Sequence, residues 1–146
     1  IISPPPSKNE QYITSNIEKS SFSNIRKMTT SNVKGKFAKT YMKTLVKNSK
    51  YALALLYPIT GRTHQLRVHM NYVGCSIIGD KKYNLNENFR DNENFLKLHS
   101  YVIKFPNQDF IKAPLPEHFI NFLKENKLDI DLEKIEKDFE KEFKYE

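Results

Sequence analysis

The chain has 146 residues, 38% of them hydrophobic and 12% aromatic, which suits one domain with a modest core. Its apolar stretches fall short of the roughly 20 residues of a membrane-spanning helix, and its first residues lack a signal-peptide pattern. We therefore expect a soluble intracellular protein with no membrane partner. The single cysteine excludes an internal disulfide framework, and Cys75 is expected to be a core residue rather than a nucleophile.

The net charge of +7 is unevenly distributed. Residues 1–82 carry 14 Lys or Arg and 3 acidic residues, whereas residues 83–146 carry 10 and 14, so the two parts have charges of +11 and −4. A basic surface of this kind attracts phosphates, and folded or duplex RNA is its natural partner. A solvated basic face without a ligand is the alternative.

Residues 1–33 show little periodicity and are rich in Pro, Ser, Asn and Thr, so an irregular or extended segment is expected there. The residues that follow alternate in character and predict a strand over 38–46. Asn48 and Ser49 can turn the chain into a second strand over 51–57, which makes a hairpin.

A turn and a short helix are predicted after this hairpin. Pro58 ends the second strand because it restricts the residue before it to an extended conformation. Gly61 gives the backbone freedom to reverse, and Thr63 is a candidate N-cap. We expect the helix over about 64–73, with its end at Gly74.

Two arginines, two histidines and a glutamine crowd into the start of this helix. Leu66, Met70 and Val73 form its apolar face. Arg67 and His64 lie three residues apart and share a different face near the helix start. Because a helix N-terminus favours anions, these residues predict an anion-binding site.

The two histidines of this stretch do not predict a metal site. His64 and His69 are five residues apart, so on a helix they point about 140° away from each other. The histidine pair of a zinc-binding helix is instead spaced i, i+4.

Shorter elements are expected downstream. A strand is predicted over 75–78, and an asparagine-rich insertion or surface loop over 84–95. Strands over 98–105 and 110–113 predict a second hairpin, in which His99 is a structural residue.

Two helices are predicted near the C-terminal end. The first follows Pro116 and ends at Asn126. The second can be capped by Asp129 or Asp131 and carries an apolar stripe. The stripe consists of Leu132, Ile135, Phe139 and Phe143. We favour packing of this stripe on the same domain, with a partner helix as the alternative.

Together these elements predict an α+β fold with a mixed or antiparallel sheet, short helices and a C-terminal helical extension. The predicted boundaries are 1–33 for an irregular N-terminal segment, 34–123 for the main domain with its insertion at 84–95, and 124–146 for the extension.

The turn and helix form one long run, Pro58-Ile59-Thr60-Gly61-Arg62-Thr63-His64-Gln65-Leu66-Arg67-Val68-His69. It is followed by Gly74, Ile77-Ile78-Gly79-Asp80 and Tyr83. Weaker likenesses hold the same order at Gly35-Lys36-Phe37-Ala38-Lys39-Thr40-Tyr41, Leu98-His99-Ser100 and Lys112-Ala113-Pro114-Leu115-Pro116. In this order the stretches resemble the RluA-type RNA pseudouridine synthases. The resemblance reaches to about Phe119 and corresponds to the later part of the family's catalytic domain, so residues 34–123 are interpreted as that part.

The resemblance implies an enzyme that converts uridine in rRNA or tRNA to pseudouridine without a metal or an organic cofactor. It makes Arg67 the ion-pair partner of the catalytic aspartate. It also implies four residues that position the backbone and the flipped nucleotide, namely Arg62, Thr63, His64 and Gln65. Asp80 is expected to fix the turn after the helix rather than to react.

The family's catalytic aspartate lies in an Arg-Leu-Asp-x-x-Thr-Ser-Gly stretch, and no aspartate of this chain has that context. The family's active-site tyrosine lies in a Lys-x-Tyr sequence, which Lys39-Thr40-Tyr41 imitates on a later strand. We therefore expect a part of a synthase that is inactive alone and whose partner is the missing N-terminal part of the same protein. A non-catalytic RNA-binding protein with this fold and an unrelated basic interaction module are the alternatives.

Overall fold

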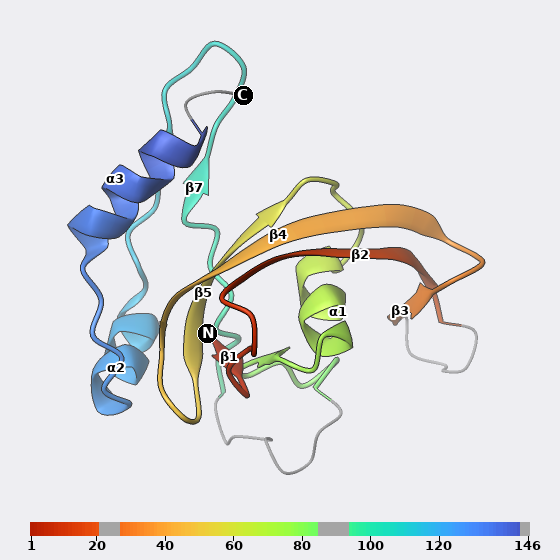
Figure 1. Cartoon of the computed structure of the whole chain (residues 1–146), viewed down its shortest axis with the longest axis horizontal. Helices are drawn as coiled ribbons and strands as arrows, with labels where there is room; N and C mark the ends of the chain where they lie inside the picture. Colours follow the sequence, from red (N-terminus) through yellow and green to blue (C-terminus); the bar gives the residue numbers. More distant parts are fainter. Residues whose placement is uncertain (21–26, 85–93, 144–146) are drawn as a thin grey trace.

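A computed structural model describes residues 1–20, 27–84 and 94–143 of the chain, with side chains described as far as residue 137. Its main sheet has six strands in the order β3-β2-β4-β5-β1-β6, and a separate pair is formed by β7 and β8. The strands are β1 (Ile2–Ser3), β2 (Glu10–Lys19), β3 (Met28–Ser31), β4 (Lys36–Lys47), β5 (Ala52–Pro58), β6 (Ser76–Ile77), β7 (Val102–Ile103) and β8 (Ile111–Lys112). The helices are α1 (Gln65–Tyr72), α2 (Glu117–Glu125) and α3 (Leu132–Phe143). All strand pairs in the described residues are antiparallel, which confirms the predicted α+β class (Figure 1).

The expectation of an irregular segment over residues 1–33 was wrong. Residues 10–19 form a long strand that pairs with β3 on one side and with β4 on the other. Two apolar side chains, Ile13 and Ile17, are each only 3% exposed, and the polar residues between them hid the strand pattern. Residues 10–17 pair with β4 and residues 16–19 pair with β3, so every residue of this strand has a neighbouring strand on at least one side. This backbone pairing compensates for the low content of apolar side chains.

The predicted hairpin is confirmed at the turn between β4 and β5. The Asn48 side-chain oxygen accepts hydrogen bonds from the backbone N–H groups of Lys50 at 2.9 Å and Tyr51 at 2.8 Å. An asparagine side chain stabilises a tight turn when it accepts from the backbone two residues on.

Helix α1 covers one face of the main sheet, which we call the inner face (Figure 1). Side chains alternate across a strand, so every second residue of β2 and β4 points toward this helix. Ile13 and Met42 pack there with Met70 of α1, and Ala38 packs with Val68. The opposite face of β2 and β4, which we call the outer face, carries the alternate residues of both strands, such as Tyr12 and Tyr41.

The C-terminal part contains both predicted helices. Phe119, Phe122 and Leu123 of α2 are buried in a cluster that includes Tyr51 of the hairpin. Asp131 caps α3, because its side chain accepts from the backbone N–H of Lys134 at 3.0 Å. None of the helices in the described ranges is long and apolar enough to cross a membrane.

Helix α3 contacts the small sheet rather than standing alone. Its Glu136 accepts a hydrogen bond from the Tyr101 hydroxyl at 2.5 Å and one from Lys112 at 3.2 Å. These contacts hold α3 against the small sheet. The predicted packing of the apolar stripe on the same domain stays a prediction, because Leu132 is 40% exposed and the side chains of Phe139 and Phe143 lie outside the described residues. The second hairpin is shorter than predicted, since only two residues pair on each strand of β7 and β8. Most of the predicted insertion over 84–95 lies outside the described residues.

Gly79 and Gly61 provide a matched test of this fold. Gly79 has a φ of +77° and a Cβ there would lie 2.2 Å from the Phe95 carbonyl oxygen, whereas a Cβ at Gly61 would meet no atom within 4 Å. We expect Gly79→Ala to lower the free energy of unfolding by about 2 to 4 kcal/mol through backbone strain and the clash. Gly61→Ala should leave it within about 1 kcal/mol or raise it. Urea unfolding of both variants measures this difference, and equal stabilities would contradict the described backbone.

Candidate active site

The turn before α1 is built differently from the prediction. His64 is the N-cap residue, with left-handed φ and ψ of 54° and 22°, and no side chain caps the helix. Thr63 is therefore not the cap, and Gly61 does not adopt a left-handed conformation. The Gln65 N–H donates to the Arg62 carbonyl at 3.0 Å, which closes a tight turn around His64. A left-handed histidine costs about 1 to 2 kcal/mol, and this strain is typical of functional sites.

Gln65 ties this turn to the sheet and is only 3% exposed. Its Oε1 accepts from the Thr60 hydroxyl at 2.6 Å and from the Arg62 N–H at 3.0 Å. Its Nε2 donates to the Lys39 carbonyl at 2.9 Å and to the Thr40 hydroxyl at 3.0 Å. Both donors and both acceptors of the amide are used, so Gln65 holds the turn against β4 and has no polar atom left for a nucleotide.

The end of the helix agrees with the prediction. Gly74 has a φ of +77°, its N–H donates to the Asn71 carbonyl, and the N–H of Cys75 donates to the Met70 carbonyl. These two bonds and the left-handed glycine form a Schellman motif, which ends a helix by satisfying its last carbonyl groups.

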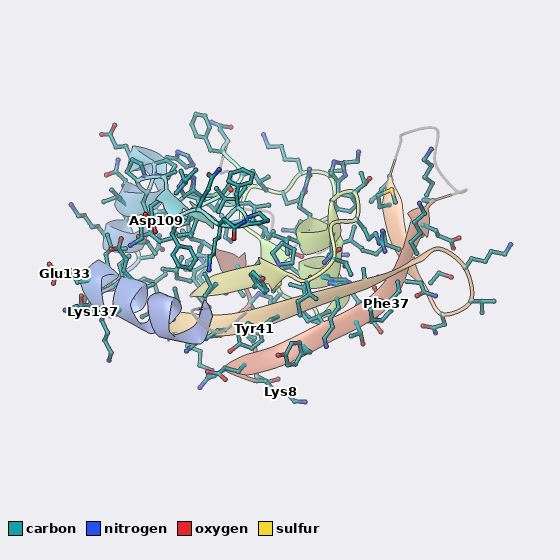
Figure 2. All side chains as sticks on the ribbon, turned by 90° about the horizontal axis from the view of Figure 1, so that it is seen from above. Lys8, Phe37, Tyr41, Asp109, Glu133 and Lys137 are labelled. Atoms are coloured by element: carbon teal, nitrogen blue, oxygen red, sulfur yellow. The ribbon has the colours of Figure 1, made fainter. Side chains whose placement is uncertain are left out.

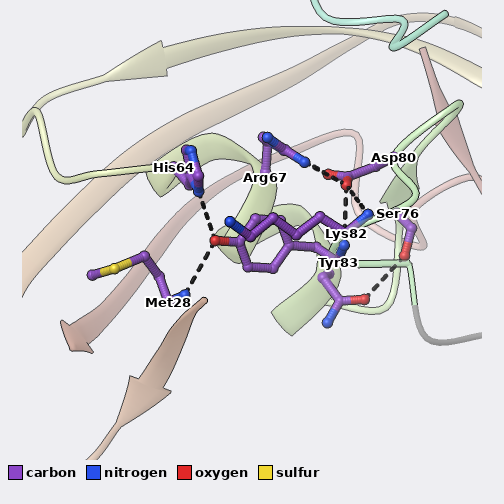
Figure 3. Close-up of polar contacts among 8 residues, drawn as sticks. Met28, His64, Arg67, Ser76, Asp80, Lys82 and Tyr83 are labelled. Carbon is purple, nitrogen blue, oxygen red and sulfur yellow. Dashed lines mark hydrogen bonds and ion pairs between the residues drawn. The ribbon is translucent and has the colours of Figure 1, made fainter. Parts of the chain in front are cut away.

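Arg67 forms a bidentate ion pair with Asp80, which closes the loop after β6 (Figure 3). Its Nε and Nη2 donate to the two carboxylate oxygens at 2.9 Å and 2.8 Å. The Asp80 side chain is 1% exposed and that of Arg67 is 20% exposed. A bidentate pair fixes the plane of the guanidinium as well as its position. Among the described residues, none accepts a hydrogen bond from the remaining nitrogen, Nη1.

Asp80 also fixes the following turn, as expected from the sequence. Its Oδ1 accepts from the backbone N–H groups of Lys82 and Tyr83, both at 3.0 Å. Burial pushes the pKa of the Asp80 carboxyl upward, but the Arg67 hydrogen bond, these backbone donors and the Arg67 charge outweigh burial. The pKa of Asp80 is therefore below its usual value, and the carboxylate is ionised at neutral pH.

Tyr83 joins the helix start to β3 (Figure 3). Its hydroxyl lies 2.7 Å from His64 Nδ1 and accepts from the Met28 N–H at 3.1 Å. Three cations surround its ring, with Arg67 Cζ at 4.9 Å, Lys27 Nζ at 5.7 Å and Lys82 Nζ at 5.8 Å from the centroid. Only Arg67 of these has a carboxylate partner among the ion pairs described, so the surroundings of Tyr83 are positively charged.

The electrostatics of this cluster keep His64 neutral. Desolvation lowers the pKa of His64, the charges of Arg67 and Lys82 lower it further, and Asp80 offsets part of this change. Because the pKa falls from an ordinary value near 6.5, the imidazole is neutral at pH 7. A neutral ring nitrogen can accept a hydrogen bond from the Tyr83 hydroxyl.

His69 lies on the other side of α1 and is completely buried. Its Nδ1 is 2.8 Å from the Thr40 hydroxyl and its Nε2 is 3.0 Å from the Ser15 hydroxyl. His64 and His69 thus contact different groups on different sides of the helix. Both ring nitrogens of His69 are used in joining α1 to β2 and β4, which gives this histidine a structural role.

The predicted site residues are only partly brought together. His64 and Arg67 both meet Tyr83, whereas Gln65 points inward to the sheet. Arg62 is exposed and its Nε donates to the Phe37 carbonyl at 2.9 Å, near the start of β4. Thr63 is exposed beside it.

Tyr83 and Lys82 were not predicted as site residues. A signal was present, since both follow Asp80 within three residues and Tyr83 belongs to the stretch that carried the resemblance. Lys27 lies 56 residues before Tyr83 in the chain, and only the pairing of β3 with β2 brings it close.

Comparison with known proteins identifies a family and several relatives. A family model described as RNA pseudouridylate synthase matches residues 1–72. The chain is 39% identical over 112 residues to ribosomal large subunit pseudouridine synthase C of Buchnera aphidicola subsp. Acyrthosiphon pisum, covering 70% of this chain and 36% of that protein. It is 38% identical over 104 residues to ribosomal large subunit pseudouridine synthase D of Borreliella burgdorferi, covering 68% and 32%. The chain thus spans about a third of the length of these relatives.

Two solved structures share the fold. Human RNA pseudouridylate synthase domain containing 1 superposes with a TM-score of 0.69 at 24% identity, covering 88% of this chain and 54% of that one. Human RNA pseudouridylate synthase domain containing 4 has the same TM-score at 23% identity, covering 88% and 60%. The chain belongs to the RNA pseudouridylate synthase family, and its relatives are of the RluA type.

The burial of His69 predicts a pH dependence of stability. Desolvation lowers its pKa in the folded protein, whereas in the unfolded chain it is near 6.5. Between these two pKa values the unfolded chain binds more protons than the folded protein. His69 therefore contributes its full share to the free energy of unfolding above about pH 6.5, and this contribution is lost as the pH falls toward the folded pKa. We expect His69→Gln to be less stable at pH 7.5 but to lose less stability on going to pH 5.5. Urea unfolding at both pH values measures this, and equal losses in the two proteins would contradict it.

Proposed function

We propose that the protein acts as an RNA pseudouridine synthase in which Arg67 holds the catalytic aspartate. The observation that carries this proposal is the rigid Arg67–Asp80 pair, which leaves Nη1 available at the start of α1. A second carboxylate that approaches Nη1 would be kept ionised and oriented by the same guanidinium. That aspartate would come from an Arg-Leu-Asp-x-x-Thr-Ser-Gly stretch, which these 146 residues do not contain.

In the proposed reaction, the bond between C1′ of the ribose and N1 of uracil breaks, the base turns, and a bond forms between C1′ and C5. The C5 proton leaves and N1 gains a proton, so the product is an isomer of the substrate. The aspartate requires its negative charge and a fixed position throughout. The Arg67 guanidinium stabilises that charge and fixes the position of the carboxylate by hydrogen bonding in a partly desolvated site. No metal or organic cofactor takes part.

The RNA backbone would lie over the positive surroundings of Tyr83. A cavity of about 200 Å³ opens beside this ring, and Lys27, Asn71 and Tyr72 contribute to its lining. Lysine at the rim of a polar cavity suits a phosphate, and phosphate contacts fix the register of a nucleic acid. Exposed Arg62 and Thr63 extend this surface along the turn, while Gln65 supports it from below.

We infer that rRNA is the substrate in preference to tRNA, because the matched bacterial relatives bear ribosomal large subunit names. A location inside the cell follows from such a substrate. Without the aspartate stretch, the 146 residues are expected to be inactive alone and to work with the part of a synthase that carries it. A non-catalytic RNA-binding protein is the second candidate, since the positive surface around Tyr83 does not depend on the aspartate.

A chimera tests the proposal directly. This chain replaces the matching part of the Buchnera synthase, so that the relative supplies the upstream residues. We expect the chimera to form pseudouridine in rRNA, measured by mass spectrometry of the digested RNA, and the 146-residue chain alone to form none. Arg67→Ala should lower kcat about 100-fold or more, because the aspartate loses its fixed partner. RNA binding should change less than threefold.

Arg62→Ala is the matched arginine control. Within the described part of the chain, its side chain contacts a backbone carbonyl at the surface and no carboxylate, so we expect a raised KM with kcat within about threefold. Turnover by Arg67→Ala within tenfold of the parent chimera would refute the role of Arg67. A folded chimera that binds RNA without turnover would favour the non-catalytic candidate.

A further inference from the structure

Three tyrosines form a row across the outer face of the main sheet. Tyr12 of β2 is the register partner of Tyr41 of β4, and Tyr41 is the register partner of Tyr57 of β5. The rings of Tyr12 and Tyr41 lie 5.3 Å apart with a tilt of 48°. Opposed residues on neighbouring strands share a face, so the three side chains project from the same face of the sheet. We call this row the tyrosine ladder.

The ladder is accessible from solvent at its β2 end. Tyr12 is 62% exposed, and Phe37, four residues before Tyr41 on the same face of β4, is 54% exposed. Figure 2 shows Phe37 and Tyr41 along this long strand. Folding drives large aromatic side chains into the core, so two exposed rings on one sheet face indicate a binding surface.

Lysines alternate with the rings. Lys39 lies between Phe37 and Tyr41 on the outer face, and its Nζ sits 4.5 Å from the centroid of the Tyr12 ring. Lys43 follows Tyr41 on the same face and approaches Glu10 at 3.8 Å. Rows of aromatic rings interrupted by cations recur where proteins bind single-stranded nucleic acid, because bases stack on rings and phosphates pair with cations.

The outer face meets the candidate active site at the edge of the sheet, because Tyr83 packs with Ile17 and Ala38 on the inner face. Arg62, in the turn before α1, donates to the backbone carbonyl of Phe37. Phe37 is therefore the residue of the outer face that contacts this turn. From Phe37 to Tyr41 the strand rises about 13 Å, which corresponds to a few nucleotides of an extended strand. Phe37, Lys39 and Tyr41 therefore form a continuous path away from Arg62.

We propose that the tyrosine ladder, with Phe37 and Lys39, binds an unpaired segment of the RNA substrate that flanks the modified uridine. The proposal rests on the proposed function for the identity of the polymer and adds a second surface outside the site. Bases stack on the exposed rings of Phe37 and Tyr12, while Lys39 neutralises a phosphate between them. The polar neighbours Thr14 and Asn16 fit this ligand better than an apolar protein partner, which would need a dry interface.

Binding of labelled RNA by the 146-residue chain tests the ladder. The probes are a fluorescein-labelled 12-nucleotide oligouridylate and the same strand in a duplex with oligoadenylate, followed by fluorescence anisotropy. We expect the double variant Tyr12→Ala/Tyr41→Ala to weaken binding of the single strand about tenfold or more. Duplex binding should change less than threefold. Tyr57 is left unchanged because it lines an apolar groove and its loss would disturb packing.

Two further variants separate stacking from other effects. Tyr12→Phe keeps the ring and should bind within twofold of the unchanged chain. Phe105→Ala removes a ring that is 46% exposed outside the ladder and should also bind within twofold. Circular dichroism and urea unfolding confirm that each variant is folded.

Each outcome decides the proposal. Single-strand binding by the double variant within twofold of the parent overturns the ladder, and an equal loss of duplex binding overturns stacking as its cause. Absence of any binding to the single strand by the unchanged chain also overturns it. The chimera separates failure of the two proposals. If it is inactive but its single-strand binding still depends on Tyr12, the synthase proposal fails and the RNA-binding role of the tyrosine ladder is supported.

Discussion

The ion pair between Arg67 and Asp80 is the interaction on which the candidate site depends. It joins α1 to the loop after β6, and the same carboxylate accepts the N–H groups that shape the turn at Tyr83. Removing one partner of a buried pair is costly because it leaves the other charge unpaired. The pair therefore serves both the local fold and the orientation of the guanidinium that we assign to catalysis.

The turn before α1 is held by a second set of contacts. Gln65 anchors it to β4, and the left-handed backbone of His64 directs the imidazole toward Tyr83. The left-handed conformation of His64 persists because the hydrogen bonds of Gln65 and the helix offset its energetic cost. Arg67 lies on α1, whereas His64, Asp80 and Tyr83 lie in turns that these hydrogen bonds fix, so the site is preorganised by its own contacts.

The sequence was sufficient for the elements whose signals are local. The hairpin at Asn48, the helix end at Gly74 and the cap at Asp131 each depend on a residue type that suits one backbone position. Strand β2 was not predicted because it forms by backbone pairing with β4 and, at its end, with β3, while its side chains are mostly polar. A pattern of side chains does not reveal such pairing.

The contacts of the candidate site could not be predicted from the sequence. Gly61 was predicted as the position of the backbone reversal, but His64 takes the left-handed conformation and its ring contacts Tyr83. The partner of Arg67 inside the chain, Asp80, lies 13 residues away and is brought close only by the packing of α1 against β6. The tyrosine ladder likewise depends on strand register, which no single stretch contains.

The most direct test of the role of the ion pair is a double-mutant cycle on kcat in the chimera with the Buchnera synthase. The cycle compares Arg67→Lys, Asp80→Asn and the two changes combined. If Asp80 acts by orienting Arg67, the combined variant will be about as slow as Arg67→Lys alone, since the second change removes nothing further. If the two losses in kcat multiply, Asp80 and Arg67 act independently, and the proposed orientation of the guanidinium by Asp80 is wrong.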